Sequence, residues 1–478
     1  MQLWLPWWEV ILLLQPAFSR WRTFVWFTVC VAGLSVRAEK LGVGLSVRAE
    51  KLGVTSIVRA LGLDGKYYDN LLDNLHSTGV KLDALSATWA KAVLRVFPGL
   101  VRVNGRLVLV GDGIKVGKQG RKMPGVKLLH QESESNSKAD YIMGHSFQAV
   151  SILARAAQSI SAVPLAARIH EGVVETNRDR RTLMDKMVAL LAIVGLADPY
   201  YFVADSYYLC RKIGRGLLAQ GNHLVVRAKS NAVAWMPHVH NGGRRGRGRP
   251  RIYGEKVKLR SLFRENLVTE EAPSPVYGEK NVTIRYAVHD LLWRPMGLIV
   301  RFVIVIHPTR GRSILMSTDT SLCAIEIIRI YGLRFKIEFA FKQAVHVFGA
   351  FYYHFWMKLM KPLKRRNGNQ YLHRESAAYR KAVKRKLHAY HVFVQAGIVA
   401  QGLAQYLAAC YQERVWRSFG SWLRTIRPGL APSELVVTTA LRHCLPEFLL
   451  DSTHGHILAK FIVERQDPDR SDVFRPAA

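Results

Sequence analysis

Apolar residues change their spacing near residue 100, and this change divides the chain into regions with different predicted structure. Residues 55–95 place apolar side chains at helical spacing, with Ser, Asp or Thr at the starts of short segments and Gly at their ends. This pattern predicts several amphipathic helices. From about residue 101 the apolar positions gather into short runs instead, and such runs predict strands that are buried on both faces.

The region after residue 101 predicts four β segments, a helix, a further strand, a second helix and another strand. The strand segments are LVLVGDG, GVKLLHQES, GHSFQAVSILAR, SAVPLAARIHEG, YYFVADS and HLVVRAKSN, and the helical segments are TNRDRRTLMDKMVALLAIVGL and CRKIGRGLLAQGN. Strands followed by a helix and a further parallel strand indicate a mixed α/β core.

Residues 230–312 interrupt this core with Gly/Arg-rich and β-like sequence, which predicts a β-rich insertion. Its basic tract cannot bury its charges. We therefore expect a solvated loop in which Arg247 and Arg249 contact DNA phosphates or lie in a minor groove. Trp293 either stacks on a base pulled out of a strained duplex end or packs within the sheet, and for Trp235 ordinary strand packing is favoured.

The sequence after residue 313 predicts a helix that carries Glu338, an aromatic and basic stretch, and a long helix over residues 377–409. The first half of the long helix is basic and its second half is apolar, so we expect one end on DNA and the other in a core. Residues 466–478 predict no ordered structure.

These patterns predict five regions. They are an N-terminal helical module that contacts DNA or a second subunit (1–100), a catalytic core in two parts (101–229 and 313–410), the β-rich insertion with its basic loop (230–312) and a C-terminal helical tail (411–478).

The segment GLSVRAEKLGV occurs at residues 33–43 and again at residues 44–54. Two copies are too few for a repeat fold, so we interpret them as a duplication of the coding DNA without a function.

Charge points to a polyanionic partner. The chain of 478 residues contains 69 Lys and Arg against 35 Asp and Glu, which gives a net charge of +34. An excess of this size is typical of nucleic-acid binding and predicts affinity that falls steeply with salt. The basic residues cluster at 244–251, 358–366 and 374–386, and one predicted core strand ends in Arg227 and Lys229, which we also expect to contact DNA.

Cysteines and the N-terminal sequence bear on the compartment. The five cysteines are an odd number without CxxC spacing, which does not indicate an oxidising compartment. The apolar N-terminus is interrupted by Glu9, Pro16, Arg20 and Arg22 before any run is long enough to span a membrane. We therefore expect no membrane association and a cytoplasmic location.

Three acidic residues in different settings suggest the chemistry. Asp112 and Asp205 each end a predicted buried strand, where a carboxylate projects into the crevice that binds ligands. Glu338 shares one face of a predicted helix with Tyr331 and Arg334. Carboxylates suit Mg²⁺, and three of them provide ligands for two ions that act on a phosphodiester. Arg334 and Tyr331 then contact the phosphate beside the cut.

The residues resemble the DDE transposases of bacterial insertion sequences, in particular those with a Tyr-Arg-Glu-Lys signature and a β insertion before the glutamate. The matching segments are LVLVGDGIKVGKQGRKMPGVKLLHQES, YYFVADS, GRPRIYGEKVKL and STDTSLCAIEIIRIYGLRFKIEFAFKQ. The resemblance implies an α/β fold with a ribonuclease-H-like mixed sheet flanked by helices, interrupted by the β-rich insertion and preceded by the helical module. It also implies metal-dependent cleavage of element ends and transfer into target DNA.

The resemblance assigns roles residue by residue. It implies that Asp112, Asp205 and Glu338 bind two Mg²⁺ ions, with Mn²⁺ as a substitute. The Lys of the family lies seven residues after the Glu, where this chain has Val345; Lys342 is a substitute candidate. The implied partner is double-stranded DNA, both element ends and target, bound by a homodimer in the bacterial nucleoid. Asp319 also follows an apolar run, but it is interpreted as a loop or cap residue before a helix.

Two other functions compete with transposition. One is a ribonuclease-H-like nuclease that hydrolyses DNA without joining it. The other is a catalytically inactive DNA-binding remnant or regulator of its own element. A recombinase with a Ser or Tyr nucleophile is disfavoured, because no Ser beside a general base stands out.

Overall fold

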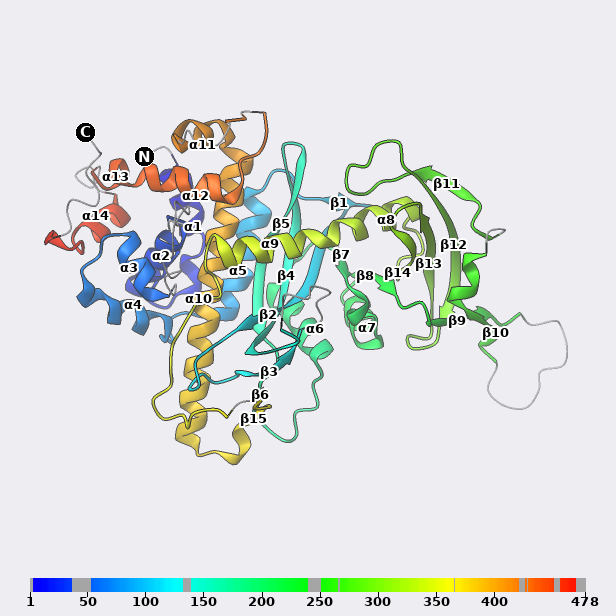
Figure 1. Ribbon diagram of the computed structural model, residues 1–478, viewed down its shortest axis with the longest axis horizontal. Coiled ribbons are helices and arrows are strands. Elements are labelled where there is room, and N and C mark those ends of the chain that lie inside the picture. The colour runs from blue at the N-terminus through cyan, green and yellow to red at the C-terminus, as the bar shows by residue number, and fades with distance from the viewer. Residues whose placement is uncertain are drawn as a thin grey trace.

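The computed structural model describes residues 3–36, 53–131, 139–239, 251–264, 267–364, 366–420, 426–427, 429–450 and 456–469. Most of the duplicated segment, and with it residues 37–52, lies outside the described residues, as do Arg247 and Arg249. The molecule is elongated, with most of the helices at one end, a large sheet through the middle and the β-rich insertion at the other end (Figure 1).

Thirteen strands in the described part of the chain form one sheet, whose main path runs β10-β9-β12-β13-β14-β8-β7-β2-β4-β3. Strands β1, β5 and β11 join it beside β2, β4 and β12, and β6 pairs separately with β15. The strands are β1 (Arg102–Val103), β2 (Arg106–Gly117), β3 (Lys127–His130), β4 (Tyr141–Ala156), β5 (Ser159–Ile169), β6 (Val173–Val174), β7 (Tyr200–Ala204), β8 (His223–Ala228), β9 (Val233–Pro237), β10 (Tyr253–Lys258), β11 (Glu270–Pro273), β12 (Thr283–Trp293), β13 (Leu298–His307), β14 (Gly311–Ser317) and β15 (Gln370–Tyr371).

Five strands in the order β5-β4-β2-β7-β8 form the centre of the sheet. Strand β4 pairs antiparallel with both β5 and β2, whereas β2 pairs parallel with β7 and β7 pairs parallel with β8. The parallel strands are connected by α6 (Leu183–Val194) and α7 (Arg211–Leu218), the two helices predicted there. The predicted ribonuclease-H-like mixed sheet flanked by helices is therefore confirmed.

The β-rich insertion continues the central sheet. Strand β14 pairs antiparallel with β8, and β13, β12, β9 and β10 follow outward from it. The final strand of the insertion thus returns the chain to the edge of the core, directly before the helix that leads to Glu338. The five region boundaries given above stay a prediction, because the sheet runs across two of them without a break.

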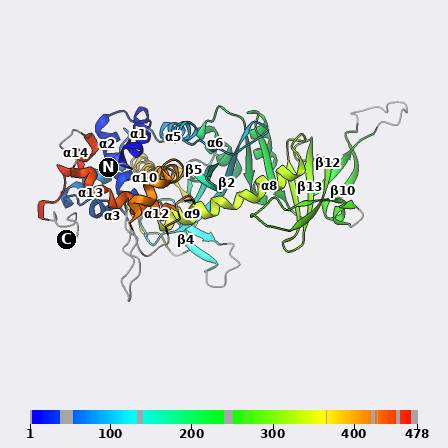
Figure 2. The same cartoon turned by 90° about the horizontal axis from the view of Figure 1, so that it is seen from above.

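The helices cover both faces of the sheet (Figure 2). Helices α5, α6 and α7 pack on one face, and α8 and α9 cross the other. The helices not yet given bounds are α1 (Trp4–Leu12), α2 (Trp21–Ser35), α3 (Val54–Ala60), α4 (Tyr68–Leu75), α5 (Leu82–Val96), α8 (Ala324–Gly332), α9 (Lys336–His346), α10 (Ala377–Cys410), α11 (Gln412–Phe419), α12 (Glu434–His443), α13 (Leu445–Leu450) and α14 (Ile457–Val463).

Helix α10 follows the division seen in its sequence. Its second half is buried almost without interruption from Ala389 to Ala408, whereas its basic start, residues 377–388, is exposed or half-buried except at Val383. By length and composition α10 could cross a membrane, but its most apolar window is 94% buried within the protein. It lies along β5 and α2, so it acts as the central helix of the helical end.

The two ends of the chain share one hydrophobic core with α10. The indole Nε1 of Trp4 donates a hydrogen bond of 3.0 Å to the Leu441 carbonyl, and the Asp64 amide donates one of 2.9 Å to the Arg465 carbonyl. Gln466 forms a β-bridge with Leu63. The expectation of disorder from residue 466 is therefore wrong for residues 466–469, which the N-terminal helices hold in place; residues 470–478 lie outside the described residues.

Candidate active site

The two-residue period of a strand carries both predicted acids onto one face of the sheet. Val108 and Val110 of β2, and Tyr201 and Val203 of β7, belong to the apolar cluster beneath α8 and α9. Side chains two residues apart share a face. The next positions of the same parity are Asp112 on β2 and Asp205 after β7. The register pairs Gly111 with Ala204, so the two acids occupy neighbouring positions where the parallel pairing ends.

Asp112 does not end its strand, contrary to the prediction. Strand β2 continues to Gly117, because beyond Gly111 it keeps its pairing with β4 after β7 has stopped. The apolar run in the sequence corresponds only to the part of β2 that is buried on both faces, so it ends before the strand does. The preceding glycine has a packing role, since a Cβ on Gly111 would lie 2.3 Å from the ring of Phe202. Asp205 does follow the last residue of its strand, as predicted.

The predicted helix around Glu338 is two helices joined by a 3-10 turn. Helix α8 ends at Gly332, the turn covers Leu333–Phe335, and α9 begins at Lys336. Arg334 lies in the turn and bridges two of the predicted acids. Its Nη1 is 3.0 Å from Oδ2 of Asp112, and its Nη2 is 2.7 Å from Oε1 of Glu338. Asp112 is 222 positions from Arg334 in sequence and Glu338 is 4 positions from it, and both carboxylates contact the same guanidinium.

The charge of Asp112 is costly in this position. Its pKa is raised to about 6, chiefly by burial and also by the negative charges of Glu338 and Asp205. The Gly113 amide, which donates to Oδ1 at 2.7 Å, and the Arg334 guanidinium oppose this rise without cancelling it. The Asp112 side chain is 23% exposed and that of Glu338 is 55% exposed, so the bridge joins a mostly buried carboxylate to an open one.

Tyr331 and Arg227 lie on the same face of the sheet as the acids. Burial raises the pKa of the Tyr331 hydroxyl to about 12, and the charge of Asp205 raises it further, whereas Arg334 and Arg227 act to lower it. Arg227 shares the parity of the buried Val225 on β8, and its side chain is exposed at the end of that strand. The structure therefore brings both predicted residues close to the acidic cluster.

A cavity of about 690 Å³ begins immediately after Asp205. Its walls combine aromatic and basic side chains, and they include two of the residues predicted to bind DNA, Lys229 and Trp293. Trp293 is only 6% exposed and belongs to the main hydrophobic core. Most of its side chain therefore packs within the protein, which agrees with the packing alternative. Trp235 is more open, and the guanidinium of Arg294 lies 5.8 Å from its ring centroid.

The two candidate positions for the signature lysine differ in environment. Lys342 is exposed on α9, one turn after Glu338. Val345 is half-buried and packs against the main hydrophobic core. Of the two positions, the exposed one is free to reach a ligand.

Asp319 takes no part in the cluster. Its Oδ2 accepts a 2.6 Å hydrogen bond from the Tyr201 hydroxyl, and its Oδ1 accepts from the Ser321 amide at 2.9 Å and from the Ser321 hydroxyl at 2.6 Å. These contacts fix the loop before α8. Asp319 is thus a loop residue, as one of the two interpretations predicted, and it does not cap α8, whose N-cap is Cys323.

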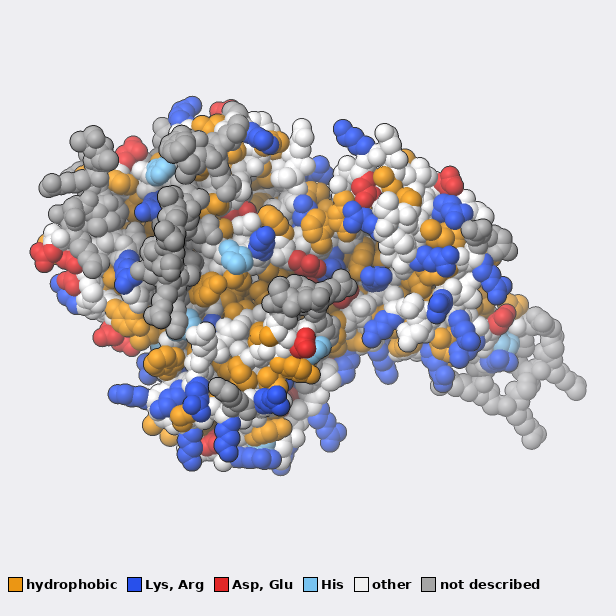
Figure 3. Space-filling view, in the orientation of Figure 1, with side chains coloured by type: hydrophobic (Ala, Val, Ile, Leu, Met, Phe, Trp, Pro, Cys, Tyr) orange, Lys and Arg blue, Asp and Glu red, His pale blue; other side chains and the backbone are white. Residues whose placement is uncertain are grey.

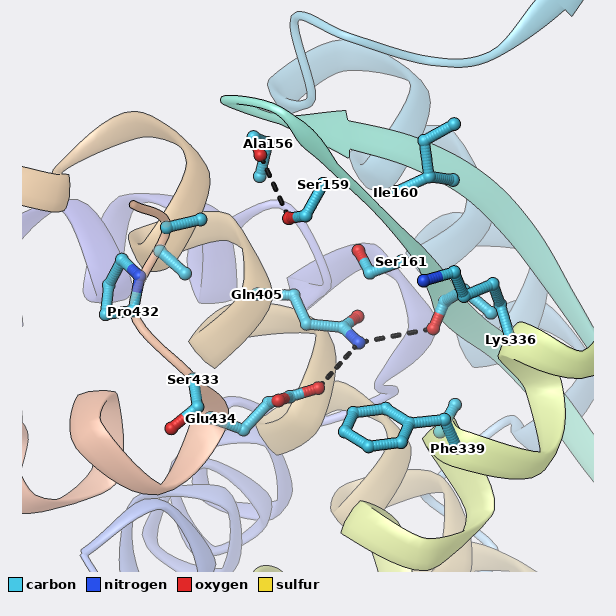
Figure 4. A pocket seen from close by; sticks show the side chains of 14 residues that line it. Ala156, Ser159, Ile160, Ser161, Lys336, Phe339, Gln405, Pro432, Ser433 and Glu434 are labelled. Atoms are coloured by element: carbon cyan, nitrogen blue, oxygen red, sulfur yellow. Dashed lines mark hydrogen bonds between the residues drawn. The ribbon is translucent and has the colours of Figure 1, made fainter. Parts of the chain in front are cut away.

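A second cavity of about 210 Å³ lies between α9, α10, β5 and the start of α12 (Figure 4). Lys336 and Phe339 of α9 line it, and Glu338 does not, because it projects from a different side of the helix. Gln405 of α10 donates from Nε2 to the Ala162 carbonyl at 3.2 Å and to the Glu434 carboxylate at 3.1 Å. This network joins α10 to the edge strand β5 and to α12, so we interpret it as structural.

The sequence did not predict two residues at the site, Tyr208 beside the acids and Arg294 in the neighbouring cavity. Tyr208 is buried, and burial together with the charges of Asp112 and Asp205 raises the pKa of its hydroxyl. Arg294 lines the cavity that begins after Asp205. A usable signal existed for Tyr208, since Tyr207 and Tyr208 come two and three residues after the strand-end Asp205. None marked Arg294, which is 89 positions from Asp205 in sequence.

A family model described as DDE superfamily endonuclease matches residues 37–295, more than half of the chain. The chain belongs to the DDE superfamily endonucleases. The predicted DDE membership is thus confirmed. The matched range of this DDE endonuclease includes Asp112 and Asp205 and ends before Glu338, which Arg334 connects to Asp112.

Other comparisons of the DDE endonuclease are more distant. Among solved structures, the cryo-EM structure of a piggyBac transposase synaptic complex with hairpin DNA matches at 11% identity with a TM-score of 0.38. That match covers 98% of this chain and 85% of the other. No curated protein sequence matches the chain.

DDE endonucleases generally use divalent metal ions, so the fit of the acidic cluster to such ions can be tested. As the side chains lie, Arg334 stands between Asp112 and Glu338, and among the described residues no group of three or more His, Cys, Asp or Glu side chains is already gathered around one point. The donor set nevertheless fits a hard cation. All three side chains are carboxylates, and a bound cation would favour the charged form of Asp112, whose pKa is raised to about 6 chiefly by burial.

Proposed function

We propose that this DDE endonuclease is the transposase of a bacterial insertion sequence, which cuts the ends of its element and joins them to target DNA. The observation that carries the proposal is the convergence of Asp112, Asp205 and Glu338 on one face of the sheet, in a chain that belongs to a DDE family. In a protein with a net charge of +34, acids placed together against their own repulsion support a site for cations.

Asp112, Asp205 and Glu338 would hold two divalent ions, Mg²⁺ or Mn²⁺ in its place. When bound, these ions would neutralise charge on the phosphodiester and lower the pKa of a water, which is the chemistry that two-ion sites supply. Asp112 and Asp205 are fixed by the sheet, whereas Glu338 is more than half exposed. The glutamate therefore completes the ligand set most easily by a side-chain movement, which the two aspartates do not need.

Arg334 would bind the phosphate beside the cut after leaving the carboxylates. Its guanidinium already lies between two carboxylates, and a phosphate offers the same paired oxygen geometry. Tyr331 stands next to it with a hydroxyl that stays protonated at neutral pH, because its pKa is about 12. It can thus donate a hydrogen bond to a phosphate oxygen throughout the reaction.

The cavity beside Asp205 supports double-stranded DNA as the partner. Lys229 and Arg294 can bind phosphates there, and Trp235 offers a partly open ring on which a base can stack. Arg227 extends the same basic surface toward the acids, and we include the basic loop with Arg247 and Arg249 as a further DNA contact. Cutting two element ends in register requires two active sites, so we propose that a homodimer assembles on DNA in the bacterial cytoplasm, with the nucleoid.

Two alternatives share the same site. A nuclease without strand transfer would use the same three acids and give hydrolysis products alone. An inactive remnant would keep the DNA surface, and the replacement of the signature lysine by Val345 favours this alternative specifically.

The experiment that separates them uses a labelled duplex carrying the sequences that flank the gene, with Mg²⁺ and the full chain. Cleavage at the element ends followed by a joined product in a second duplex is the expected result. Cleavage without joining would replace the proposal with the nuclease alternative. Salt-sensitive binding with neither product would replace it with the inactive remnant.

A further inference from the structure

One lobe of the molecule is built from the segments that follow β2 and α9. We define the basic lobe as residues 118–127, residues 354–374 with β15, and the first part of α10 to residue 386. It has a small apolar core of its own, formed by Met357, Met360, Leu372 and Val383. Lys118 is already about 20 Å along β2 from Asp112, at about 3.3 Å per residue, so the lobe is separate from the acidic cluster.

Two large apolar side chains stand out from this lobe. Trp356 is 68% exposed and Leu359 is 69% exposed, although each is followed by a buried methionine. The segment is held by its backbone, because the Met357 amide donates to the Lys122 carbonyl at 2.9 Å and the Leu363 amide donates to the Arg121 carbonyl at 2.7 Å. The exposure therefore belongs to an anchored surface.

A glycine fixes where the indole of Trp356 lies. A Cβ on Gly120 would approach Nε1 of Trp356 to 3.1 Å and the sulfur of Met123 to 2.6 Å. The indole edge thus rests against the glycine backbone, which gives the ring a defined position without covering it. Figure 3 shows Lys and Arg gathered on the lobe at the bottom of the view.

Cations surround the exposed apolar pair. Residues 354–386 contain eleven Lys and Arg and one acid, Glu375. Lys358, Lys361 and Lys364 are exposed on the same segment as Trp356 and Leu359, and they form no ion pair with any residue that the structure describes. Lys384 of α10 is paired with Glu175 at 3.0 Å, so α10 contributes its charge mainly through its other cations.

We infer that the basic lobe is a second surface for double-stranded DNA, distinct from the active site. Lys358, Lys361 and Lys364 bind phosphates, and Trp356 and Leu359 enter the minor groove between them. Apolar wedges flanked by cations are the means by which proteins hold and bend a duplex from the minor groove. A protein partner is disfavoured, because covering so many unpaired cations would cost more than two apolar side chains return.

This inference rests on the proposed function only for the choice of DNA as the polyanion, and it is tested without catalysis. The full chain is titrated onto a labelled duplex in EDTA at several salt concentrations. For Lys358→Gln with Lys361→Gln, the slope of log affinity against log salt is expected to fall by about 2, since each phosphate contact contributes about 0.9. The control is Lys91→Gln, an exposed lysine on α5, which should leave the slope unchanged.

The apolar pair has a different expected signature. Trp356→Ala with Leu359→Ala should weaken binding about tenfold with the salt slope unchanged, and should reduce the bend of the duplex measured by energy transfer between its ends. Trp21→Ala is the matched control, because Trp21 is a 45% exposed tryptophan on α2, away from the lobe. Gly120→Ala displaces the indole without removing it and should lose part of the bend.

Three outcomes overturn the inference. Unchanged slope and affinity in both lobe variants would show that DNA binds elsewhere. Loss of self-association in sedimentation without DNA would make the lobe an interface between copies, and equal loss of binding to vesicles containing anionic lipid would make it a lipid surface. A parent that binds and bends DNA through the lobe but neither cuts nor joins it would refute the proposed function and leave this inference standing.

Discussion

The acidic cluster and the basic lobe place charge in opposite ways. The cluster gathers Asp112, Asp205 and Glu338 from distant segments and keeps Asp112 mostly buried, with a pKa raised to about 6. The lobe exposes its cations in water, where like charges are screened and cost little. Burying the charge of Asp112 in the cluster costs free energy that the fold does not require. The exposed cations of the lobe carry no such cost. Stored cost of this kind marks a site that binds or reacts.

The largest expected effect follows from removing a carboxylate of the cluster. Asp112→Asn and Glu338→Gln should each lower the rate of Mg²⁺-dependent cleavage by about a thousandfold or more, since ion binding supplies several kcal/mol of transition-state stabilisation. DNA binding in EDTA should be unchanged. Asp319→Asn is the matched control, because Asp319 is a buried acid after a strand and lies outside the cluster; its cleavage rate should equal that of the parent.

Arg334 should show a smaller effect with two parts. Arg334→Gln removes a charged partner from a phosphate, worth about 1.5 to 3 kcal/mol, so cleavage should fall about 10- to 100-fold. The same change removes the cation between Asp112 and Glu338. Mn²⁺ should therefore bind more tightly, with half saturation at a lower free Mn²⁺ concentration. Weaker Mn²⁺ binding in this variant would contradict the assignment of the three acids as ligands.

The cost of ionising Asp112 should appear in the stability of the metal-free protein. A carboxyl whose pKa is raised on folding favours the folded state when protonated, and this contribution is lost as the pH rises from its unfolded value near 4 through about 6. Asp112→Asn cannot ionise, so it should exceed the parent in free energy of unfolding by about 1 to 3 kcal/mol at pH 7.5. Thermal unfolding in EDTA at pH 4 should show this difference reduced or absent.

The signature lysine position should give the smallest effect. Lys342 is exposed, and an exposed charge contributes about 0.2 to 1 kcal/mol, so Lys342→Ala should lower cleavage by no more than about fivefold. Val345→Lys should not raise the cleavage rate, because the position is half-buried against the core. A large gain from Val345→Lys would show instead that α9 rotates when DNA binds.

Much of the central sheet could be predicted from apolar runs. Strands buried on both faces leave a continuous signal, and β7 and β8 were found for this reason. The same signal misplaced the end of β2, because the apolar run stops where the neighbouring strand β7 ends, whereas β2 itself continues to Gly117. The break between α8 and α9 had no signal either, since Leu333 and Phe335 are as suitable for a helix as for a 3-10 turn.

The contacts between distant segments could not be predicted. The sequence brought Asp112, Asp205 and Glu338 together only through resemblance, and the register of β2 against β7 supplies the physical reason. Arg334 was expected on a phosphate, and its bridge between Asp112 and Glu338 depends on how α9 crosses the sheet. The packing of the C-terminal helices onto the N-terminal helices likewise leaves no pattern in the sequence of either segment.

The most direct test of the central claim exchanges one carboxylate for a thiolate. Asp205→Cys replaces a hard oxygen ligand with a soft sulfur ligand at the position that follows β7, and soft ligands disfavour Mg²⁺ more than Mn²⁺. We predict that cleavage of the element-end duplex by this variant is abolished in Mg²⁺ and partly restored in Mn²⁺, with Asp205→Ala inactive in both. Parent-like cleavage by Asp205→Cys in Mg²⁺ would contradict the claim that these acids hold the ions that cut DNA.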